Sequence, residues 1–224
     1  MHGTPYYPEI NLTEGELVEL AKKAVGNNIM VTNSYRAAEQ WGFGTPIWHG
    51  LSPDEWFDLV KEPRIVTMIG PGGLDSYYDR QFLRGVKEVL EEEGIIHCHI
   101  TVDFTANNWD EYRKFLGSSL VYFNPTRESP MPRARTEAMF SGCCVLTTNN
   151  QDADRIFKHS ENGFFVKRNP TDVLRLVKWC FNNYNRAVEI GQKGKETAIE
   201  LFSWNRFEQD WRSLIEKTLN IKIK

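Results

Sequence analysis

The sequence lacks a long apolar run, a charged-then-apolar pattern at its N-terminus and any excess of positive charge. No stretch approaches the roughly 18 apolar residues that a membrane-spanning helix requires, so a transmembrane segment is not expected. The 27 Lys and Arg are outnumbered by 30 Asp and Glu, which gives a net charge of -3. Without a basic stripe, broad capture of nucleic acid is not expected either. These absences predict a cytoplasmic protein, with peripheral membrane association left open.

Cysteine is also scarce. The sequence contains no Cys-x-x-Cys pair among Cys98, Cys143, Cys144 and Cys180, and Cys143 and Cys144 lie in an apolar run. This pattern favours buried free thiols in a reducing compartment over a disulfide framework. With 41% hydrophobic and 25% charged residues, the composition is that of a globular protein. A chain of 224 residues suffices for one large domain or for one domain and a piece of another.

The chain changes in character after Pro63. Before it, Thr13 and Glu16 form a capping-box pattern at the start of a helix over 13–25, and Ser34 begins a short helix that ends at Gly42. Beyond it, short strands rich in Ile, Val and Leu alternate with helices. We predict strands at 64–69, 95–102, 120–124, 143–148 and 163–166, helices at 76–93, 108–116, 133–141 and 152–158, and a helical end at 171–184, 185–201 and 205–219. This alternation predicts an α/β fold, namely a Rossmann-like parallel sheet with helices on both faces and a helical C-terminal extension.

A glycine-rich turn, GPGG at 70–73, follows the first strand of the alternating region. The dinucleotide fingerprint Gly-x-Gly-x-x-Gly would require a glycine at Asp75, so a site of the NAD type is not expected. Gly72 and Gly73 would let backbone N–H groups approach a phosphate closely, and Arg80 in the following helix is placed to reach a diphosphate. The alternative is a plain strand-to-helix turn beside a solvated surface arginine.

A second candidate site is the loop at 126–132 together with the helix that follows it. Pro132 is favourable at the start of a helix, and the N–H groups of that helix start form an anion site. Glu137 stands about one turn inside the helix among small and apolar residues, where an acid is costly unless it is paired. A carboxylate there suits sugar hydroxyls because it accepts two hydrogen bonds. A salt-bridged or solvated glutamate is the alternative, and Arg133 and Arg135 either add charge to the site or face solvent.

Three motifs in order resemble those of retaining glycosyltransferases of the GT4 type, which have the GT-B fold. FNPTRESPMPRARTEAMFSG at 123–142 resembles the family pattern P-S-x-x-E-G-F-G-x-x-x-x-E-A-M-x-x-G, and NGFFV at 162–166 resembles N-G-x-L-V. FSW at 202–204 resembles the family's F-S-W. The resemblance implies transfer of a sugar from a nucleotide-diphosphate sugar to a glycan, lipid or small-molecule acceptor. It implies no bound metal and no other cofactor.

The resemblance also implies roles for individual residues. Glu137 would hold the ribose, and the nucleotide sugar would further contact Gly72, Gly73, Arg80, Met131, Pro132, Arg133 and Ala134. The family's first glutamate, which contacts the transferred sugar, falls on Ser129 here, and Glu128 lies one residue early. Either a bulge lets Glu128 serve, or Ser129 and the backbone of 130–132 replace that contact, which we prefer because two prolines stiffen the loop. The candidate catalytic residues are His2, at the place of a family histidine near the sugar, with Glu128 and Ser129.

Domain boundaries follow from the same resemblance. Residues 1–48 would be a remnant of the N-terminal, acceptor-side domain with its hinge, 49–204 the nucleotide-sugar-binding domain, and 205–224 the helix that crosses back. About half of a complete enzyme would then be absent, in either a truncated chain or an unusually short natural protein. Two further functions stay open. One is a non-catalytic nucleotide-sugar-binding module that needs a partner domain or a second copy, and the other is a GT-B-type sugar-nucleotide epimerase.

Overall fold

A five-stranded parallel sheet forms the main body of the protein. The computed structural model describes residues 4–5, 11–68, 78–100 and 107–222. The strand order is β4-β3-β5-β6-β7, and every neighbouring pair runs in parallel. The strands are β3 (Glu62–Met68), β4 (His97–Ile100), β5 (Ser119–Asn124), β6 (Cys144–Thr148) and β7 (Phe164–Val166). The predicted α/β fold is therefore confirmed, although the strand ends shift and residues 69, 76–77 and 101–102 of predicted elements lie outside the described ranges.

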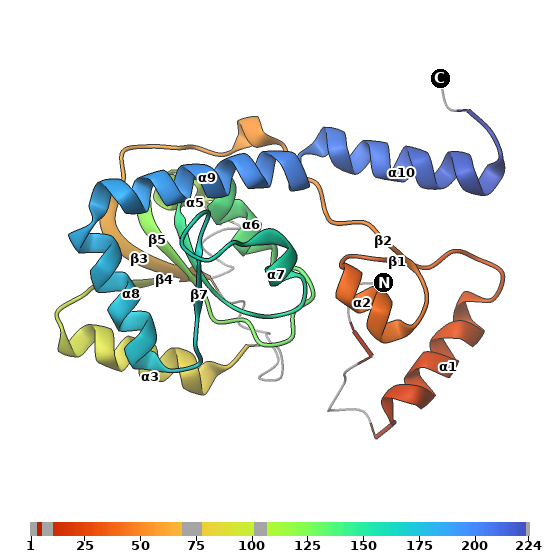
Figure 1. The fold of residues 1–224 in the computed structure, drawn as a ribbon, viewed down its shortest axis with the longest axis horizontal. Coiled ribbons are helices and arrows are strands. Elements are labelled where there is room, and N and C mark those ends of the chain that lie inside the picture. Colours follow the sequence, from red (N-terminus) through yellow and green to blue (C-terminus); the bar gives the residue numbers. More distant parts are fainter. Residues whose placement is uncertain (1–3, 6–10, 69–77, 101–106, 223–224) are drawn as a thin grey trace.

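Helices cover both faces of this sheet (Figure 1). One face carries α3 (Arg80–Glu92) and α8 (Pro170–Asn182), and the other carries α5 (Trp109–Gly117) and α6 (Arg133–Phe140). The long helix α9 (Tyr184–Phe202) contributes residues to the cores on both faces. Successive strand residues alternate between the two faces. Val121 packs into the core beneath α3 and α8, whereas Tyr122 packs with α5 and α6. The sheet is buried on both sides, which explains its strands rich in Val, Leu and Ile.

The strand order fixes the edge at which a ligand is expected. From β3 the chain passes to β4 on one side of the sheet and then crosses to β5 on the other side. In doubly wound sheets, ligands bind beyond the carboxyl ends of the strands at such a switch point. Here that point lies beyond Met68 of β3 and Asn124 of β5, where the loop to α6 begins.

Two glycines let α6 and α9 touch. Gly142 ends α6 with a positive φ of 69°, and a Cβ on it would lie 2.6 Å from an oxygen of Asp58. A Cβ on Gly191 of α9 would lie 2.3 Å from the carbonyl oxygen of Gly142. Neither position has room for a side chain, and glycine also adopts the left-handed conformation at Gly142 without steric cost. The glycine of the E-A-M-x-x-G motif is thus required by packing.

A buried lysine joins the segment before β3 to two of these helices. The Lys61 ammonium donates hydrogen bonds to the carbonyls of Gly117, at the end of α5, and Ser141, just after α6. It also pairs with Asp58 at 3.0 Å. Asp58 in turn accepts hydrogen bonds from Gln192 and Lys195 of α9, at 2.9 and 3.0 Å. Because each buried charge is paired, this network fixes the relative positions of α5, α6 and α9.

Residues 11–48 form a smaller body beside the sheet, called here the N-terminal segment. It contains α1 (Glu14–Val25), α2 (Tyr35–Trp41) and a parallel pair, β1 (Val31–Thr32) with β2 (Thr45–Pro46). The predicted capping box is confirmed, because Glu16 N–H donates to Thr13 Oγ1 at 3.2 Å and Thr13 N–H donates to Glu16 at 2.8 Å. Ser34 and Gly42 cap the two ends of α2, also as predicted.

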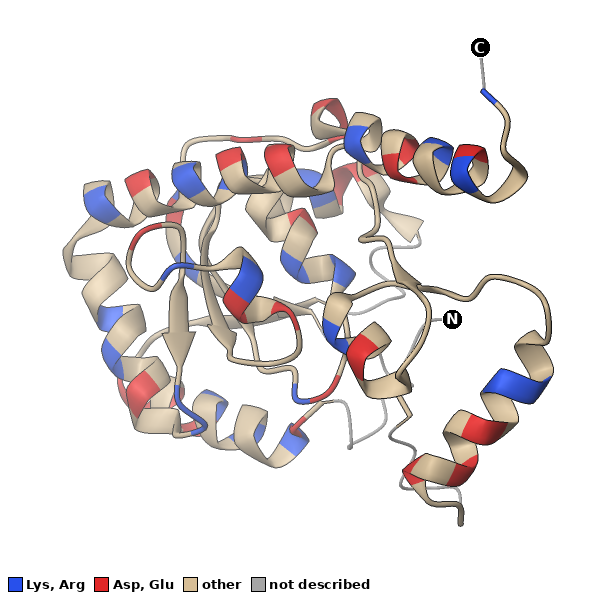
Figure 2. Ribbon diagram, turned by 45° about the vertical axis from the view of Figure 1, so that its right-hand side comes forward, with Lys and Arg blue, Asp and Glu red and all other residues tan. Residues whose placement is uncertain are grey.

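Two chain segments leave the sheet body side by side, one at Leu51 and the other at Phe202 to Trp204. After the 3₁₀ turn η1 (Pro53–Glu55) comes β3, and α10 (Trp204–Leu219) leaves the sheet body at the end of α9 (Figure 1). Leu51 N–H donates to the Phe202 carbonyl at 2.8 Å, and Trp204 N–H donates to the Leu51 carbonyl at 2.9 Å. Lysine, arginine and acidic residues are interspersed along α9 and α10 (Figure 2). Within the described ranges, no helix has the length and apolarity needed to cross a membrane.

Replacing Gly191 by alanine is expected to destabilise the protein, because the new Cβ would collide with the Gly142 carbonyl oxygen. Overpacking of this kind costs about 1–3 kcal/mol of unfolding free energy, measurable by urea denaturation. The matched control is Gly15→Ala in α1, where a Cβ would meet nothing within 4 Å. That change should be neutral or stabilising by up to about 1 kcal/mol. Equal effects of the two substitutions would contradict the proposed contact.

Candidate functional site

The loop from β5 to α6 lies at the switch point and is fastened at its beginning. The Thr126 carbonyl accepts hydrogen bonds from Thr148 Oγ1 at the end of β6 and from Arg168 Nη2 at 3.2 Å. Thr126 also forms an antiparallel bridge with Tyr78, which places the start of α3 beside the loop. Arg80 is the first residue of α3, so it lies two residues beyond this bridge.

Glu137 of α6 is buried, and both of its carboxylate oxygens are bonded. Tyr112 of α5 donates its hydroxyl to Oε2 at 2.6 Å, and Arg133 Nε donates to Oε1 at 2.9 Å. Tyr112 is fully buried, whereas the Arg133 side chain is 64% exposed. Burial and the adjacent Glu137 raise the pKa of Tyr112 well above its usual range, which keeps this tyrosine a hydrogen-bond donor. One carboxylate oxygen is thus held inside the protein, and the other pairs with an exposed arginine.

The first turn of α6 has no side-chain cap among the described residues. Pro132 occupies the N-cap position, one residue earlier than a first helical position. The N–H groups of Arg133 and Ala134 therefore lie at an uncapped helix start, where the positive end of the helix dipole favours an anion. Met131 and Pro132 beside them are buried.

Arg135 differs from both expectations drawn from the sequence, because it neither faces solvent nor lies open to a ligand. It is 1% exposed, and its Nη1 donates to Asn150 Oδ1 at 3.1 Å. Its Nη2 lies 3.7 Å from the Met131 sulfur, and its guanidinium lies 5.5 Å from the Phe157 ring centroid. Burial lowers the pKa of Arg135 to about 10. Helical spacing could have predicted this burial, since residue 135 shares a face with Ala138 three residues later.

Glu128 and Ser129 lie in the same loop, next to the end of β6. The Ser129 carbonyl accepts a hydrogen bond from Asn150 Nδ2 at 2.9 Å. Glu128 accepts a longer one, 3.4 Å, from Gln151 Nε2. The structure thus gathers Glu128, Ser129, 131–134 and Glu137 on one loop and helix. The remaining predicted residues, His2, Gly72 and Gly73, lie outside the described ranges.

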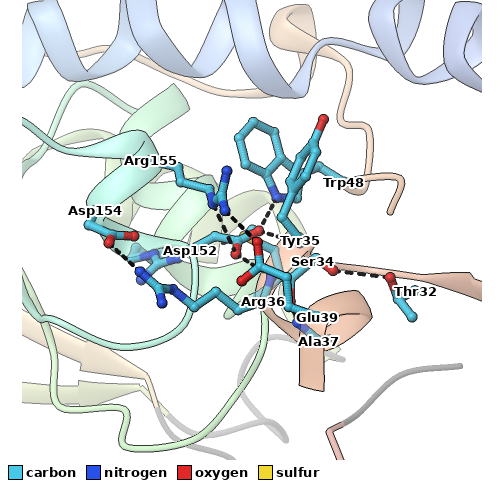
Figure 3. Close-up of polar contacts among 12 residues, drawn as sticks. Thr32, Ser34, Tyr35, Arg36, Ala37, Glu39, Trp48, Asp152, Asp154 and Arg155 are labelled. Carbon is cyan, nitrogen blue, oxygen red and sulfur yellow. Dashed lines mark hydrogen bonds and ion pairs between the residues drawn. The ribbon is translucent and has the colours of Figure 1, made fainter. Parts of the chain in front are cut away.

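An Asp-x-Asp triplet, Asp152-Ala153-Asp154, lies at the start of α7 (Ala153–Ile156), and the sequence analysis overlooked it. Asp152 is fully buried and accepts hydrogen bonds from the N–H groups of Tyr35 and Arg36 and from the indole of Trp48, at 2.7, 2.8 and 2.7 Å (Figure 3). Asp154 pairs with Arg36. Both carboxylates therefore hold the N-terminal segment. In the part of the chain that the structure describes, no group of three or more His, Cys, Asp or Glu is placed to bind a metal.

His49 lies in the connection between the two bodies and contacts α6. Its Nε2 lies 3.0 Å from Thr136 Oγ1, and its ring stacks on Phe202 at 5.5 Å between centroids. Burial, together with nearby arginines that include Arg133 and Arg135, lowers the pKa of His49 to about 3. The imidazole is therefore neutral near neutral pH.

A parallel sheet with this strand order, an uncapped helix start and a buried acid at the switch point together make up a doubly wound α/β domain. The sequence model of one family, described as glycosyl transferases group 1, matches residues 65–197. The chain belongs to that family.

Individual relatives are distant. Spore coat protein SA of Bacillus subtilis (strain 168) is 20% identical over 162 residues, which cover 71% of this chain and 43% of that protein. This chain thus spans less than half the length of the curated relative. Anabaena HepE in complex with UDP and glucose gives a TM-score of 0.73 at 13% identity, over 96% of this chain and 70% of HepE. Sucrose-phosphate synthase of Thermosynechococcus elongatus gives a TM-score of 0.67 at 12% identity, over 95% of this chain and 65% of the synthase. These structures share the GT-B glycosyltransferase fold with this chain.

The buried His49 should make stability depend on pH. In the folded protein it stays neutral down to a pKa of about 3, whereas an unfolded histidine takes up a proton near 6.5. Between these pH values the unfolded state binds more protons, so stability falls as the pH decreases from 6.5. The slope from one such group is at most about 1.4 kcal/mol per pH unit.

Urea unfolding of the wild type and His49→Gln across this pH range checks the effect. The acid-side slope should be shallower in the variant. Identical slopes in the two proteins would contradict a buried neutral His49.

Tyr112→Phe removes the one buried donor to Glu137 and leaves the ring packing intact. The carboxylate oxygen then loses its partner inside the protein, so the unfolding free energy should fall by about 1–3 kcal/mol. Urea denaturation measures this change. A variant as stable as the wild type would show that the 2.6 Å hydrogen bond contributes nothing to stability.

Proposed function

We propose that this chain carries the nucleotide-sugar-binding part of a retaining glycosyltransferase of the GT4 type, which transfers a sugar from a nucleotide-diphosphate sugar to an acceptor. The observation that carries the proposal is Glu137, a buried acid at the switch point with one oxygen fixed by Tyr112 and the other paired with an exposed arginine. This geometry suits a ribose, whose hydroxyls would replace Arg133 on Oε1. The family membership and the fold shared with HepE, which was solved with UDP and glucose, support it.

The diphosphate is assigned to the positive groups around this acid. The uncapped start of α6 offers N–H groups at Arg133 and Ala134, and Arg80 begins the helix beside the same loop. Gly72 and Gly73 complete the proposed phosphate contacts. When the bond to the sugar breaks, negative charge grows on the leaving diphosphate, and oriented N–H groups and guanidinium groups stabilise it. The proposal includes no metal and no further cofactor.

The transferred sugar is assigned to the loop at Glu128 and Ser129, with His2 as the catalytic candidate from the N-terminal side. We retain the proposed domains, 1–48, 49–204 and 205–224. The paired crossings support these boundaries, because Leu51 lies hydrogen-bonded between Phe202 and Trp204. The segment at Leu51 and the segment at Phe202 to Trp204 therefore meet where the sheet body ends. The acceptor would be bound largely by groups outside the described loop.

A second function, a nucleotide-sugar-binding module that needs a partner domain or a second copy, is favoured by α10. None of its residues is buried, and Trp204 and Leu219 are 54% and 60% exposed. In this alternative a partner covers that helix, and the chain alone turns nothing over. Sugar transfer or donor hydrolysis by the isolated chain, measured by release of nucleoside diphosphate, would exclude it.

Replacing Glu137 by alanine should weaken nucleotide binding. Loss of a charge-assisted hydrogen bond to ribose costs about 1.5–3 kcal/mol, or roughly 10- to 150-fold in Kd. Calorimetric titration with UDP, GDP, ADP and CMP first identifies the base that the wild type binds, and the same nucleotide is then titrated into the variant. Glu111→Ala is the control, because this exposed glutamate of α5 pairs with Lys114 at the surface. An unchanged Kd in a folded Glu137→Ala protein would remove Glu137 from the site.

A further inference from the structure

Three consecutive residues at the carboxyl end of β6 contact three different parts of the protein. Asn150 reaches the loop before α6, Gln151 reaches Glu128 in that loop, and Asp152 reaches the N-terminal segment. These residues, 150–152, are called the connector here. It lies between β6, which ends at Thr148, and α7, which begins at Ala153. So short a connection leaves little freedom for one of its residues to move without the others.

The side chain of Asn150 has one orientation that satisfies both of its neighbours. The Arg135 guanidinium can only donate hydrogen bonds, and the Ser129 carbonyl can only accept them. The Asn150 oxygen must therefore face Arg135, at 3.1 Å, and its amide nitrogen must face Ser129, at 2.9 Å. Arg135 is buried, its hydrogen-bond partners are neutral, and within the described residues it has no carboxylate partner at ion-pair distance. The buried Arg135 guanidinium thus orients the Asn150 amide, and this amide is hydrogen-bonded to the loop at Ser129.

Gln151 has a backbone conformation that is uncommon for a residue with a side chain, with a φ of 47°. Surrounding contacts must maintain such a conformation. Both neighbours of Gln151 in the sequence make such contacts: Asn150 is hydrogen-bonded to Ser129, and Asp152 is hydrogen-bonded to Tyr35. The left-handed turn directs residues 150 and 152 toward different parts of the protein.

Asp152 anchors the far end of the connector. Figure 3 shows its carboxylate between Trp48 and the first residues of α2. Three N–H donors from the N-terminal segment, at 2.7, 2.8 and 2.7 Å, satisfy this fully buried carboxylate. Two ion pairs at the edge, Arg36–Asp154 and Arg155–Glu39, add surface contacts to the same joint. Without α2 this buried carboxylate would lose two of its three N–H donors and keep the Trp48 indole and Arg155 Nε, which lies 3.9 Å away. This joint and the connector conformation therefore depend on each other.

We propose that the connector couples docking of the N-terminal segment to the shape of the donor loop, with Asn150 and Arg135 as positioning residues for Ser129. The proposal rests on the proposed function where it names a donor, since Ser129 lies in the loop assigned to the transferred sugar. Docking of α2 on Asp152 fixes the connector, Asn150 then holds the Ser129 carbonyl, and the sugar-binding part of the loop is formed before the ligand arrives. Asp152 itself touches no ligand in this scheme.

Hydrogen exchange tests the coupling without any ligand. Peptides that cover residues 127–131 are followed by mass spectrometry in the wild type, Asn150→Ala, Asp152→Asn and the control Asp154→Asn. Asn150→Ala and Asp152→Asn should each speed exchange in this loop by about fivefold or more, because local opening becomes easier. Asp154→Asn removes a surface pair only and should leave it unchanged. Peptides from β5 and β6 should keep their protection in all four proteins, which separates the effect from global unfolding.

The coupling would be overturned if Asp152→Asn sped hydrogen exchange in residues 34–48 and left exchange in the loop at 127–131 unchanged. Should Asp152→Asn fail to fold, Trp48→Phe replaces it, because it removes one donor to Asp152 and keeps most of the ring.

A second arm tests the link to the donor with UDP and UDP-glucose as probes. The ratio of the Kd for UDP-glucose to that for UDP should rise about tenfold in Asn150→Ala and Asp152→Asn, with UDP binding itself little changed. An unchanged ratio would overturn the role of the connector in sugar binding. If the wild type binds none of UDP, GDP, ADP and CMP, the proposed function fails, while hydrogen exchange still decides whether the coupling exists.

Discussion

The close contact between α6 and α9 determines where the candidate site lies. Gly191 meets the carbonyl oxygen of Gly142 directly, and the Lys61 ammonium binds the carbonyl of Ser141 next to it. The C-terminal end of α6 is thereby fixed against the sheet. Since a helix is stiff over two turns, its N-terminal end and Glu137 are fixed as well. A contact made by backbone atoms and glycines thus sets the position of an acid at the switch point.

Buried charges define the geometry of this edge of the sheet. Glu137, Arg135 and Asp152 are all removed from water, and each is held by specific hydrogen bonds. Such charges are expensive to bury, and their contribution to stability is small or negative. They do restrict the direction of the hydrogen bonds around them, because a carboxylate only accepts hydrogen bonds and a guanidinium only donates them. The orientations of Tyr112 and Asn150 follow from that restriction.

The N-terminal segment is integrated with the sheet body through two different joints. One is the pair of backbone crossings at Leu51, and the other is the buried carboxylate of Asp152. The first consists of two hydrogen bonds between backbone groups, and Arg206 Nη2 adds hydrogen bonds to the carbonyls of Trp48 and His49, at 2.7 and 3.0 Å. The second depends on charge and on the orientation of α2. The family match at 65–197 covers most of the sheet body and includes Asp152, whereas α2 and Trp48, which donate to Asp152, lie outside that match.

Local patterns determined much of this protein. Alternating apolar strands and helices specified the parallel sheet, the Thr13 and Glu16 pair specified the start of α1, and the motif glycines marked places without room for a side chain. The family-like motifs also selected Glu137. Only the tertiary structure decided which groups meet it. Tyr112 lies 25 residues away in sequence, and Asp152 lies 117 residues from its partner Tyr35. Periodicity shows which face of an element is buried, but the partner across that face depends on strand order and packing, which are properties of the whole fold.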